Sequence, residues 1–119
     1  MKASIPRVIL YRIGRDKAEK NLYVILSDER RAWCLFSDLS RAVQYRADWL
    51  WAETGWEFGP MDDNEFRQFL ASFGDSDLIV RDPQPSDKDC YCIEVSRLRD
   101  LVARGENDAE FELHAVAGS

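Results

Sequence analysis

The sequence predicts a single α+β domain, in which a largely antiparallel mixed sheet of order βββααββαβ carries helices on one face. The chain has 119 residues, of which 45% are hydrophobic and 12% aromatic, so it can form one domain with a buried core. Its first third consists of apolar segments separated by short polar loops. From Ser37 onward the apolar residues take helical spacing, and later segments return to strand spacing.

Three strands are predicted in the first third. Arg7–Ile13 is rich in β-branched and aromatic residues and is followed by a charged turn at 14–21. Leu22–Leu26 is a continuous apolar run, which predicts a central strand buried on both faces. A hairpin loop at 28–31 leads into the third strand, Ala32–Phe36. Short polar loops between consecutive strands indicate an antiparallel meander.

A first helix follows these strands. Ser37 or Asp38 fits its N-cap, and Gly55 fits its stop. At 100° per residue, one stripe of this helix is expected to face the core. The stripe consists of Leu39, Val43 and Leu50.

The second helix has the clearest start in the chain. Asp62 fits the N-cap and Glu65 the N3 position of a capping box, and Met61 and Phe66 occupy the positions of a hydrophobic staple. Apolar residues then recur at i, i+3, i+4 and i+7, and Gly74 ends the helix. These residues are Phe66, Phe69, Leu70 and Phe73.

The remaining segments alternate between strands and one short helix. A strand at 78–80 and a proline-containing loop at 82–89 precede a strand at 90–95. Ser96 is expected to cap a third helix that Gly105 closes. The last strand, 109–116, alternates between two faces. We expect Phe111 and Leu113 to point inward with Ala109 and Ala115, and Glu110, Glu112 and His114 to point outward.

Charge is divided unevenly along the chain. Residues 1–60 hold 10 Lys/Arg and 8 Asp/Glu, a formal +2, whereas residues 61–119 hold 6 and 14, a formal −8. An acidic surface repels nucleic acid and anionic membranes and attracts basic protein surfaces. The expected partner is therefore one protein with a basic surface, with no direct nucleic-acid contact and no membrane contact.

Few residues carry a chemical signature. The chain has an odd number of cysteines, Cys34, Cys90 and Cys92, and no export signal is recognised. We therefore expect reduced, half-buried thiols. A cysteine paired with His114 would be the nucleophile and base of a thiol enzyme, but no motif supports that pairing. The chain lacks zinc-type cysteine spacing and glycine-rich phosphate loops. We therefore expect no catalytic residue, no metal and no cofactor.

The candidate partner-binding residues are aromatic and acidic. Exposed Trp and Tyr side chains are the usual anchors of protein interfaces, and acidic residues around them would suit a basic partner. The aromatic candidates are Tyr45, Trp49, Trp51 and Trp56. The acidic candidates are Asp75, Asp77, Asp82, Asp87 and Asp89 around a strand–loop–strand unit, and Glu106, Asp108, Glu110 and Glu112 on or before the last strand.

The layout of residues 22–102 resembles some small uncharacterised bacterial domain families. It comprises a strand with Trp33, a Trp-containing helix, the segment Pro-Met-Asp-Asp-Asn-Glu-Phe-Arg-Gln-Phe-Leu at 60–70, the strand at 78–80 and Leu-Arg-Asp-Leu at 98–101. In size, acidity and compartment the chain also resembles bacterial immunity proteins, which neutralise contact-dependent or type VI secreted toxins. The resemblance implies a class of role and carries over no site residue.

The leading hypothesis is a cytoplasmic, non-enzymatic inhibitor that covers the basic active-site cleft of a toxin such as a nuclease. An alternative is a phage-encoded protein that imitates nucleic-acid charge and inhibits a host defence complex, as an anti-CRISPR does. A small thiol-dependent enzyme and an oligomerising structural domain, including a weak homodimer, are further alternatives. The first residues read as a strand and no apolar run reaches about 20 residues, so the cytoplasm is the expected compartment.

Overall fold

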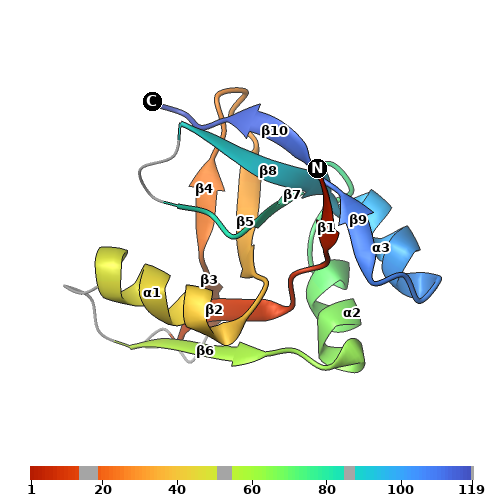
Figure 1. Cartoon of the computed structure of the whole chain (residues 1–119), viewed down its shortest axis with the longest axis horizontal. Coiled ribbons are helices and arrows are strands. Elements are labelled where there is room, and N and C mark those ends of the chain that lie inside the picture. Colours follow the sequence, from red (N-terminus) through yellow and green to blue (C-terminus); the bar gives the residue numbers. More distant parts are fainter. Residues whose placement is uncertain (14–18, 51–54, 85–87, 119) are drawn as a thin grey trace.

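The computed structural model describes residues 1–13, 19–50, 55–84 and 88–118. Across these residues the chain forms three helices and a mixed sheet, which confirms the predicted α+β class (Figure 1). The helices are α1 (Leu39–Trp49), α2 (Asp63–Ala71) and α3 (Val95–Ala103). The strands are β1 (Lys2–Ser4), β2 (Val8–Ile13), β3 (Glu19–Asn21), β4 (Tyr23–Ile25), β5 (Arg31–Phe36), β6 (Trp56–Pro60), β7 (Leu78–Arg81), β8 (Asp89–Glu94), β9 (Asp108–Glu110) and β10 (Glu112–Ala115).

Five strands of the main sheet close into a ring. β5 pairs in parallel with β7, and β8 and β10 follow as antiparallel neighbours. On its other edge β5 pairs with β4, and the residue after β4 bridges the residue after β10. The N–H of Ser27 donates to the C=O of Ala115, and the N–H of Ala117 donates to the C=O of Ile25, each at 2.9 Å. We call β4, β5, β7, β8 and β10 the strand ring.

The predicted second strand is divided into two short strands that pair with different partners. β3 pairs with β2 and β4 pairs with β5, and between them the C=O of Leu22 accepts from the N–H of Cys34 at 2.9 Å. Tyr23 and Ile25 are 43% and 40% exposed. The prediction of a central strand buried on both faces is therefore wrong. The outward face of β4 is covered only in part, by contacts such as that between the rings of Tyr23 and Trp33.

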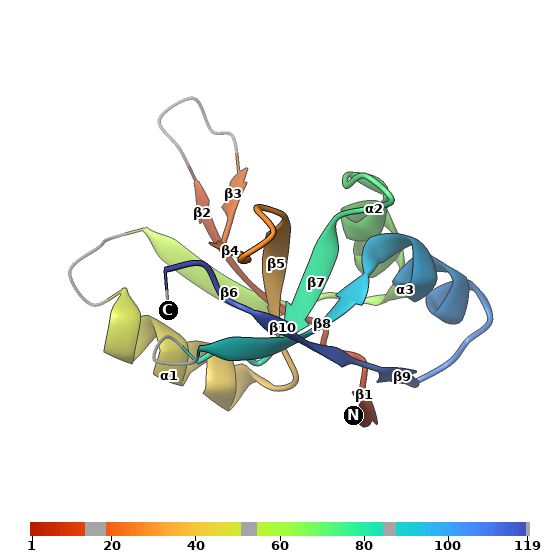
Figure 2. The same ribbon diagram turned by 90° about the horizontal axis from the view of Figure 1, so that it is seen from above.

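The core occupies both faces of the main sheet. One buried cluster, which includes Phe66, Leu98 and Phe111, lies where α2 and α3 cover the sheet. The other cluster contains the inward-facing residues of the strand ring and includes Ala42 of α1. The helices thus lie on both faces, α1 apart from α2 and α3 (Figure 2), whereas the sequence predicted one face. The closure of the ring curves the sheet, so its concave face also needs a cover.

The second helix begins as predicted. A carboxylate oxygen of Asp62 accepts from the N–H of Glu65 at 2.8 Å, and a carboxylate oxygen of Glu65 accepts from the N–H of Asp62 at 3.3 Å. This capping box satisfies backbone donors that the first turn leaves unpaired. Phe66 and Leu70, four residues apart, are both almost fully buried. The sequence therefore placed both the start and the inner face of α2 correctly.

The first helix packs through a different face from the one predicted. Leu39 and Val43 are 46% and 39% exposed, and of the predicted stripe only Leu50 is buried. Ala42 is fully buried instead, and the half-buried Tyr45 packs its ring against the core. The small side chain of Ala42 lets the helix approach the sheet closely. A stripe chosen by hydrophobicity alone misses such a contact.

The C-terminal segments differ from the prediction in three ways. The last strand is divided at Phe111, because β9 pairs with β1 and β10 pairs with β8. Phe111 is buried as predicted, but Leu113 is 57% exposed. α3 begins at Val95, so Ser96 is not its cap. Elsewhere in the chain, β1 is a separate short strand that pairs with β9, and β6, which the sequence left outside its strands, pairs with β2.

Candidate functional site at the open end of the strand ring

The predicted aromatic anchors occupy different environments. Tyr45 and Trp56 are half-buried, and the ring of Tyr45 meets that of Phe36 edge-on at 5.4 Å between centroids. Trp49, at the end of α1, is 52% exposed. Trp51 lies outside the described residues. Among the described aromatic candidates, Trp49 is therefore the side chain with a large free surface.

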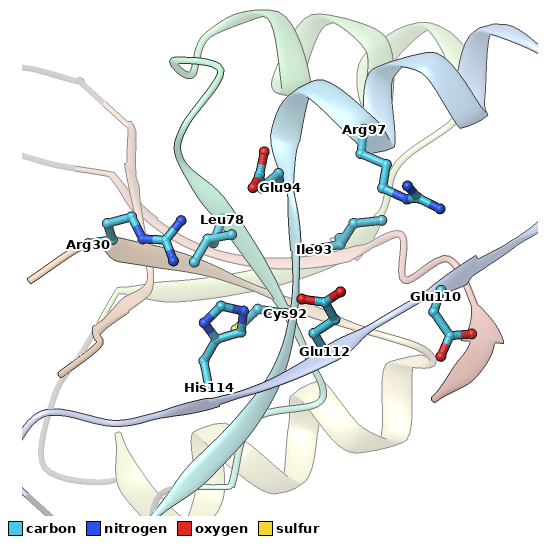
Figure 3. Close-up of a pocket in the computed structure, with 9 residues that line it drawn as sticks. All are labelled: Arg30, Leu78, Cys92, Ile93, Glu94, Arg97, Glu110, Glu112 and His114. Carbon is cyan, nitrogen blue, oxygen red and sulfur yellow. The ribbon is translucent and has the colours of Figure 1, made fainter. Parts of the chain in front are cut away.

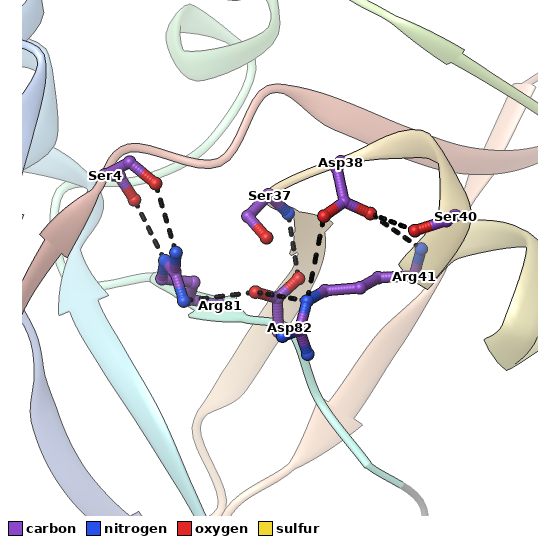
Figure 4. A network of polar contacts seen from close by, with 7 residues as sticks. All are labelled: Ser4, Ser37, Asp38, Ser40, Arg41, Arg81 and Asp82. Carbon is purple, nitrogen blue, oxygen red and sulfur yellow. Dashed lines mark hydrogen bonds and ion pairs between the residues drawn. The ribbon is translucent and has the colours of Figure 1, made fainter.

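Asp82 is a structural residue and not a surface acid. Its side chain is only 7% exposed, and it accepts the N–H of Ser37 at 2.8 Å (Figure 4). Arg81 lies 3.1 Å and Arg41 3.7 Å from its carboxylate. Arg81 also donates to the C=O of Ser4 at 2.9 Å. This network joins the end of β7 to the start of α1 and to β1, and it removes Asp82 from the expected binding face.

The other acids of the first group are divided between structural and free positions. A carboxylate oxygen of Asp75 lies 2.5 Å from Arg99, and Asp77 accepts the N–H of Gly74 at 2.8 Å. Asp89 is exposed at the start of β8, and Asp87 lies outside the described residues. Asp75 and Asp77 therefore hold the turn between α2 and β7.

The second acidic group forms a continuous strip along β9 and β10. We call Glu106, Asp108, Glu110 and Glu112 the acidic strip. All four residues are exposed, while Ala109 and Phe111 between them are buried. Glu110 pairs with the N-terminal ammonium group at 2.7 Å. The alternation that the sequence predicted for this region is thus present as far as Glu112.

The exposed tryptophan and the acidic strip lie far apart. Figure 1 shows α1 and β9 at opposite ends of the molecule. The structure does not bring Trp49 and the acidic strip into one patch, although the sequence hypothesis combined an aromatic anchor with an acidic rim. Glu112 instead faces a cavity at the open end of the strand ring.

This cavity, which we call the mouth cavity, has a volume of about 460 Å³. Its walls are formed by the loop between β4 and β5, by strands β7, β8 and β10, by α3, and by Glu110 at the end of β9 (Figure 3). It is lined by Arg30, Leu78, Cys92, Ile93, Glu94, Arg97, Glu110, Glu112 and His114. Register explains the grouping, because Glu112 pairs with Cys92 and His114 with Cys90 on the concave face of the ring. Glu94 shares that face because it lies two residues beyond Cys92.

The charged groups of the mouth cavity differ in their fixed partners. The side chain of Arg30 donates from Nε to Asp28 at 2.8 Å, and the backbone N–H of Arg30 donates to the same carboxylate at 3.0 Å. Both bonds lower the pKa of Asp28, and the bond from the backbone N–H has the larger effect. Glu110 is held by the N-terminus. Within the described part of the chain, Glu94, Glu112 and Arg97 form no ion pair.

The three thiols are buried. Cys34, Cys90 and Cys92 are free and at most 5% exposed. They are therefore more deeply buried than the half-buried thiols that the sequence predicted. Burial raises the pKa of Cys34, and hydrogen bonding to Cys90 followed by burial raises the pKa of Cys92. Cys92 shares the mouth cavity with His114. A thiol that stays protonated is a poor nucleophile, so this pair lacks the ionised sulfur that thiol catalysis needs.

Three charged residues of the mouth cavity were not singled out by the sequence. Glu94 could have been found, because strand alternation places it on the same face as Cys90 and Cys92. Arg30 and Arg97 could not, since their approach depends on the pairing of distant strands and on the early start of α3.

No protein-family model, curated protein or solved structure matches the chain. Within the described ranges, no three His, Cys, Asp or Glu side chains are grouped as metal ligands would be. None of the helices there has the length and apolar character needed to cross a membrane.

Proposed function

We propose that this protein is a non-enzymatic inhibitor that binds one protein partner with a basic surface, through the acidic strip. The observation that carries the proposal is the strip itself: one exposed acid just before β9 and three on β9 and β10, of which, in the described part of the chain, only Glu110 has a fixed ionic partner. Alternate residues of a strand stand about 6.5–7 Å apart, so Asp108 and Glu110 on β9 present two carboxylates at that spacing, and Glu112 follows at the start of β10. Such a row suits a basic cleft.

The partner that we propose is a bacterial toxin with a basic active-site cleft, such as a nuclease, and the role is that of an immunity protein. The resemblance of the chain to immunity proteins in size and acidity supports this choice. The acidic strip would steer the partner and block its substrate, while exposed apolar side chains would supply packing. Tyr91 and Leu113, which pair across β8 and β10, are 38% and 57% exposed on the face of these strands opposite to Glu112.

A cytoplasmic location and a non-enzymatic role belong to the same proposal. The buried free thiols fit a reducing compartment, in which thiols stay reduced. The burial and raised pKa of Cys34 and Cys92 support the absence of thiol catalysis. Rapid alkylation of a cysteine in the native protein near neutral pH would contradict this part of the proposal.

The proposal can be tested by comparative capture. Wild-type protein and a strip variant would be immobilised and exposed to a lysate of the source organism at low and high salt. The strip variant carries Asp108→Asn, Glu110→Gln and Glu112→Gln. A matched control would carry Asp48→Asn, Glu57→Gln and Asp100→Asn, which neutralise three exposed acids outside the strip. We expect one stoichiometric basic protein that the wild type and the control retain at low salt and the strip variant loses.

Two results would contradict the proposal. A partner retained equally by the strip variant would exclude the acidic strip as its binding surface. No partner at either salt concentration would favour an enzyme or small-molecule role instead. If the captured partner is a subunit of a nucleic-acid-guided defence complex, the charge-imitating inhibitor is the correct form of the same binding role.

A further inference from the structure

The mouth cavity combines unpaired charges of both signs over an apolar floor. Arg97 on one side and Glu94 and Glu112 on the other line one space, yet they form no ion pair with one another or with any other described residue. In the view of Figure 3, the guanidinium groups of Arg30 and Arg97 lie on opposite sides and the two carboxylates lie between them. The opposite charges therefore remain available to a ligand.

The floor of the cavity is apolar and buried. Leu78, Cys92 and Ile93 are at most 4% exposed and belong to the packed core of the sheet. These residues are fixed by the strand ring, so the cavity does not depend on a loop closing over it. Its volume of about 460 Å³ is within the usual range for sites of small molecules.

We propose that the mouth cavity binds a small zwitterion, namely a free α-amino acid. Its ammonium group would be held by Glu94 and Glu112, and its carboxylate by Arg97. A purely cationic ligand would be repelled by Arg30 and Arg97, and a purely anionic ligand would be repelled by the carboxylates of Glu94, Glu110 and Glu112. A ligand with both charges satisfies both sets, and charge-assisted hydrogen bonds are the strong ones.

The test uses wild-type protein and three probes of matched shape. L-Leucine carries both charges, L-leucinamide only the ammonium group, and 4-methylpentanoate only the carboxylate. Each is titrated at millimolar concentrations into ¹⁵N-labelled protein while backbone amide shifts are recorded. We expect L-leucine to give saturable shifts at Glu94, Glu112 and His114, and each single-charge probe to bind more than about tenfold more weakly.

Variants identify the groups responsible. Glu112→Gln and Arg97→Gln keep side-chain size and are expected to weaken L-leucine binding by more than about tenfold each. Glu57→Gln on β6 and Arg104→Gln at the end of α3 are matched controls outside the cavity and should leave binding unchanged. Circular dichroism confirms that each variant is folded.

Three results would overturn the inference: no saturable shift with L-leucine, equal binding of either single-charge probe, or equal losses in the control variants. Each result is obtained without a protein partner. Failure here would therefore leave the proposed inhibitor function standing, and failure of the capture experiment would leave this site standing.

Discussion

Replacing Arg99 by alanine should destabilise the protein through the C-terminus of α2. The guanidinium group of Arg99, on α3, donates to the C=O of Leu70 through Nε at 3.0 Å and through Nη2 at 2.7 Å, and it also donates to the C=O of Phe73. α2 has no basic residue in its own last turn. Arg99 therefore supplies from another helix the positive charge and the donors that a helix C-terminus lacks.

The expected loss can be worked out from these contacts. The Arg99 side chain is 30% exposed, so water can partly replace it, and each carbonyl should lose about 1 kcal/mol. The charge at the helix end adds about 0.5 kcal/mol. Asp75 is 82% exposed, so its ion pair should contribute about 0.5 kcal/mol or less. We therefore expect Arg99→Ala to lower the free energy of unfolding by about 2–3 kcal/mol.

Urea denaturation followed by circular dichroism measures this loss. With a slope of about 2 kcal/mol per M, the midpoint should fall by about 1–1.5 M while the slope stays constant. Asp75→Asn removes only the ion pair and should change the free energy of unfolding by about 0.5 kcal/mol or less. A change within about 0.5 kcal/mol for Arg99→Ala, or an equally large loss for Asp75→Asn, would refute the reasoning.

Three further predictions concern stability. Burial keeps Cys34 protonated in the folded state, whereas an unfolded thiol ionises near the ordinary pKa of 9.0, so above about pH 9 the unfolded state binds fewer protons and stability should fall. Cys34→Ala should flatten this decline of the urea midpoint with pH. An unchanged decline in the variant would count against this prediction. Asp82→Ala leaves the N–H of Ser37 without its acceptor and Arg81 without its ion-pair partner, and it should cost about 2 kcal/mol. Asp82→Asn should cost less, because Asn tolerates the positive φ of 49° at this position. Calorimetry that ranks the two variants in reverse would argue against the network. Trp49→Ala should change the unfolding free energy by about 0.5 kcal/mol or less because the side chain is 52% exposed, and a larger loss would indicate hidden packing.

The sequence predicted those parts of the fold that depend on neighbours along the chain. The capping box of Asp62 and Glu65 and the burial of Phe66 and Leu70 follow from spacing within one helix. The pairing of distant strands does not follow from such spacing. Ring closure between β4 and β10 therefore could not be predicted, and neither could its consequence that α1 covers the concave face through Ala42.

The candidate site follows the same division. Alternation along the predicted last strand placed Glu110 and Glu112 outward, and both are exposed, because buried and exposed residues alternate locally. The mouth cavity arises only where β10 meets β8 beside the β4–β5 loop. The roles of Asp82 and Asp75 were misjudged for a similar reason. Their partners Ser37 and Arg99 lie 45 and 24 residues away.

The central claim is that the acidic strip steers a basic partner. The most direct test is the association rate of the captured partner with wild-type protein, with the Asp108→Asn/Glu110→Gln/Glu112→Gln variant and with the matched control, as a function of salt. We predict that the strip variant associates about tenfold more slowly at low salt, and that its rate approaches that of the wild type at high salt as charges are screened. Equal rates and an equal salt dependence for the strip variant and the wild type would contradict the claim.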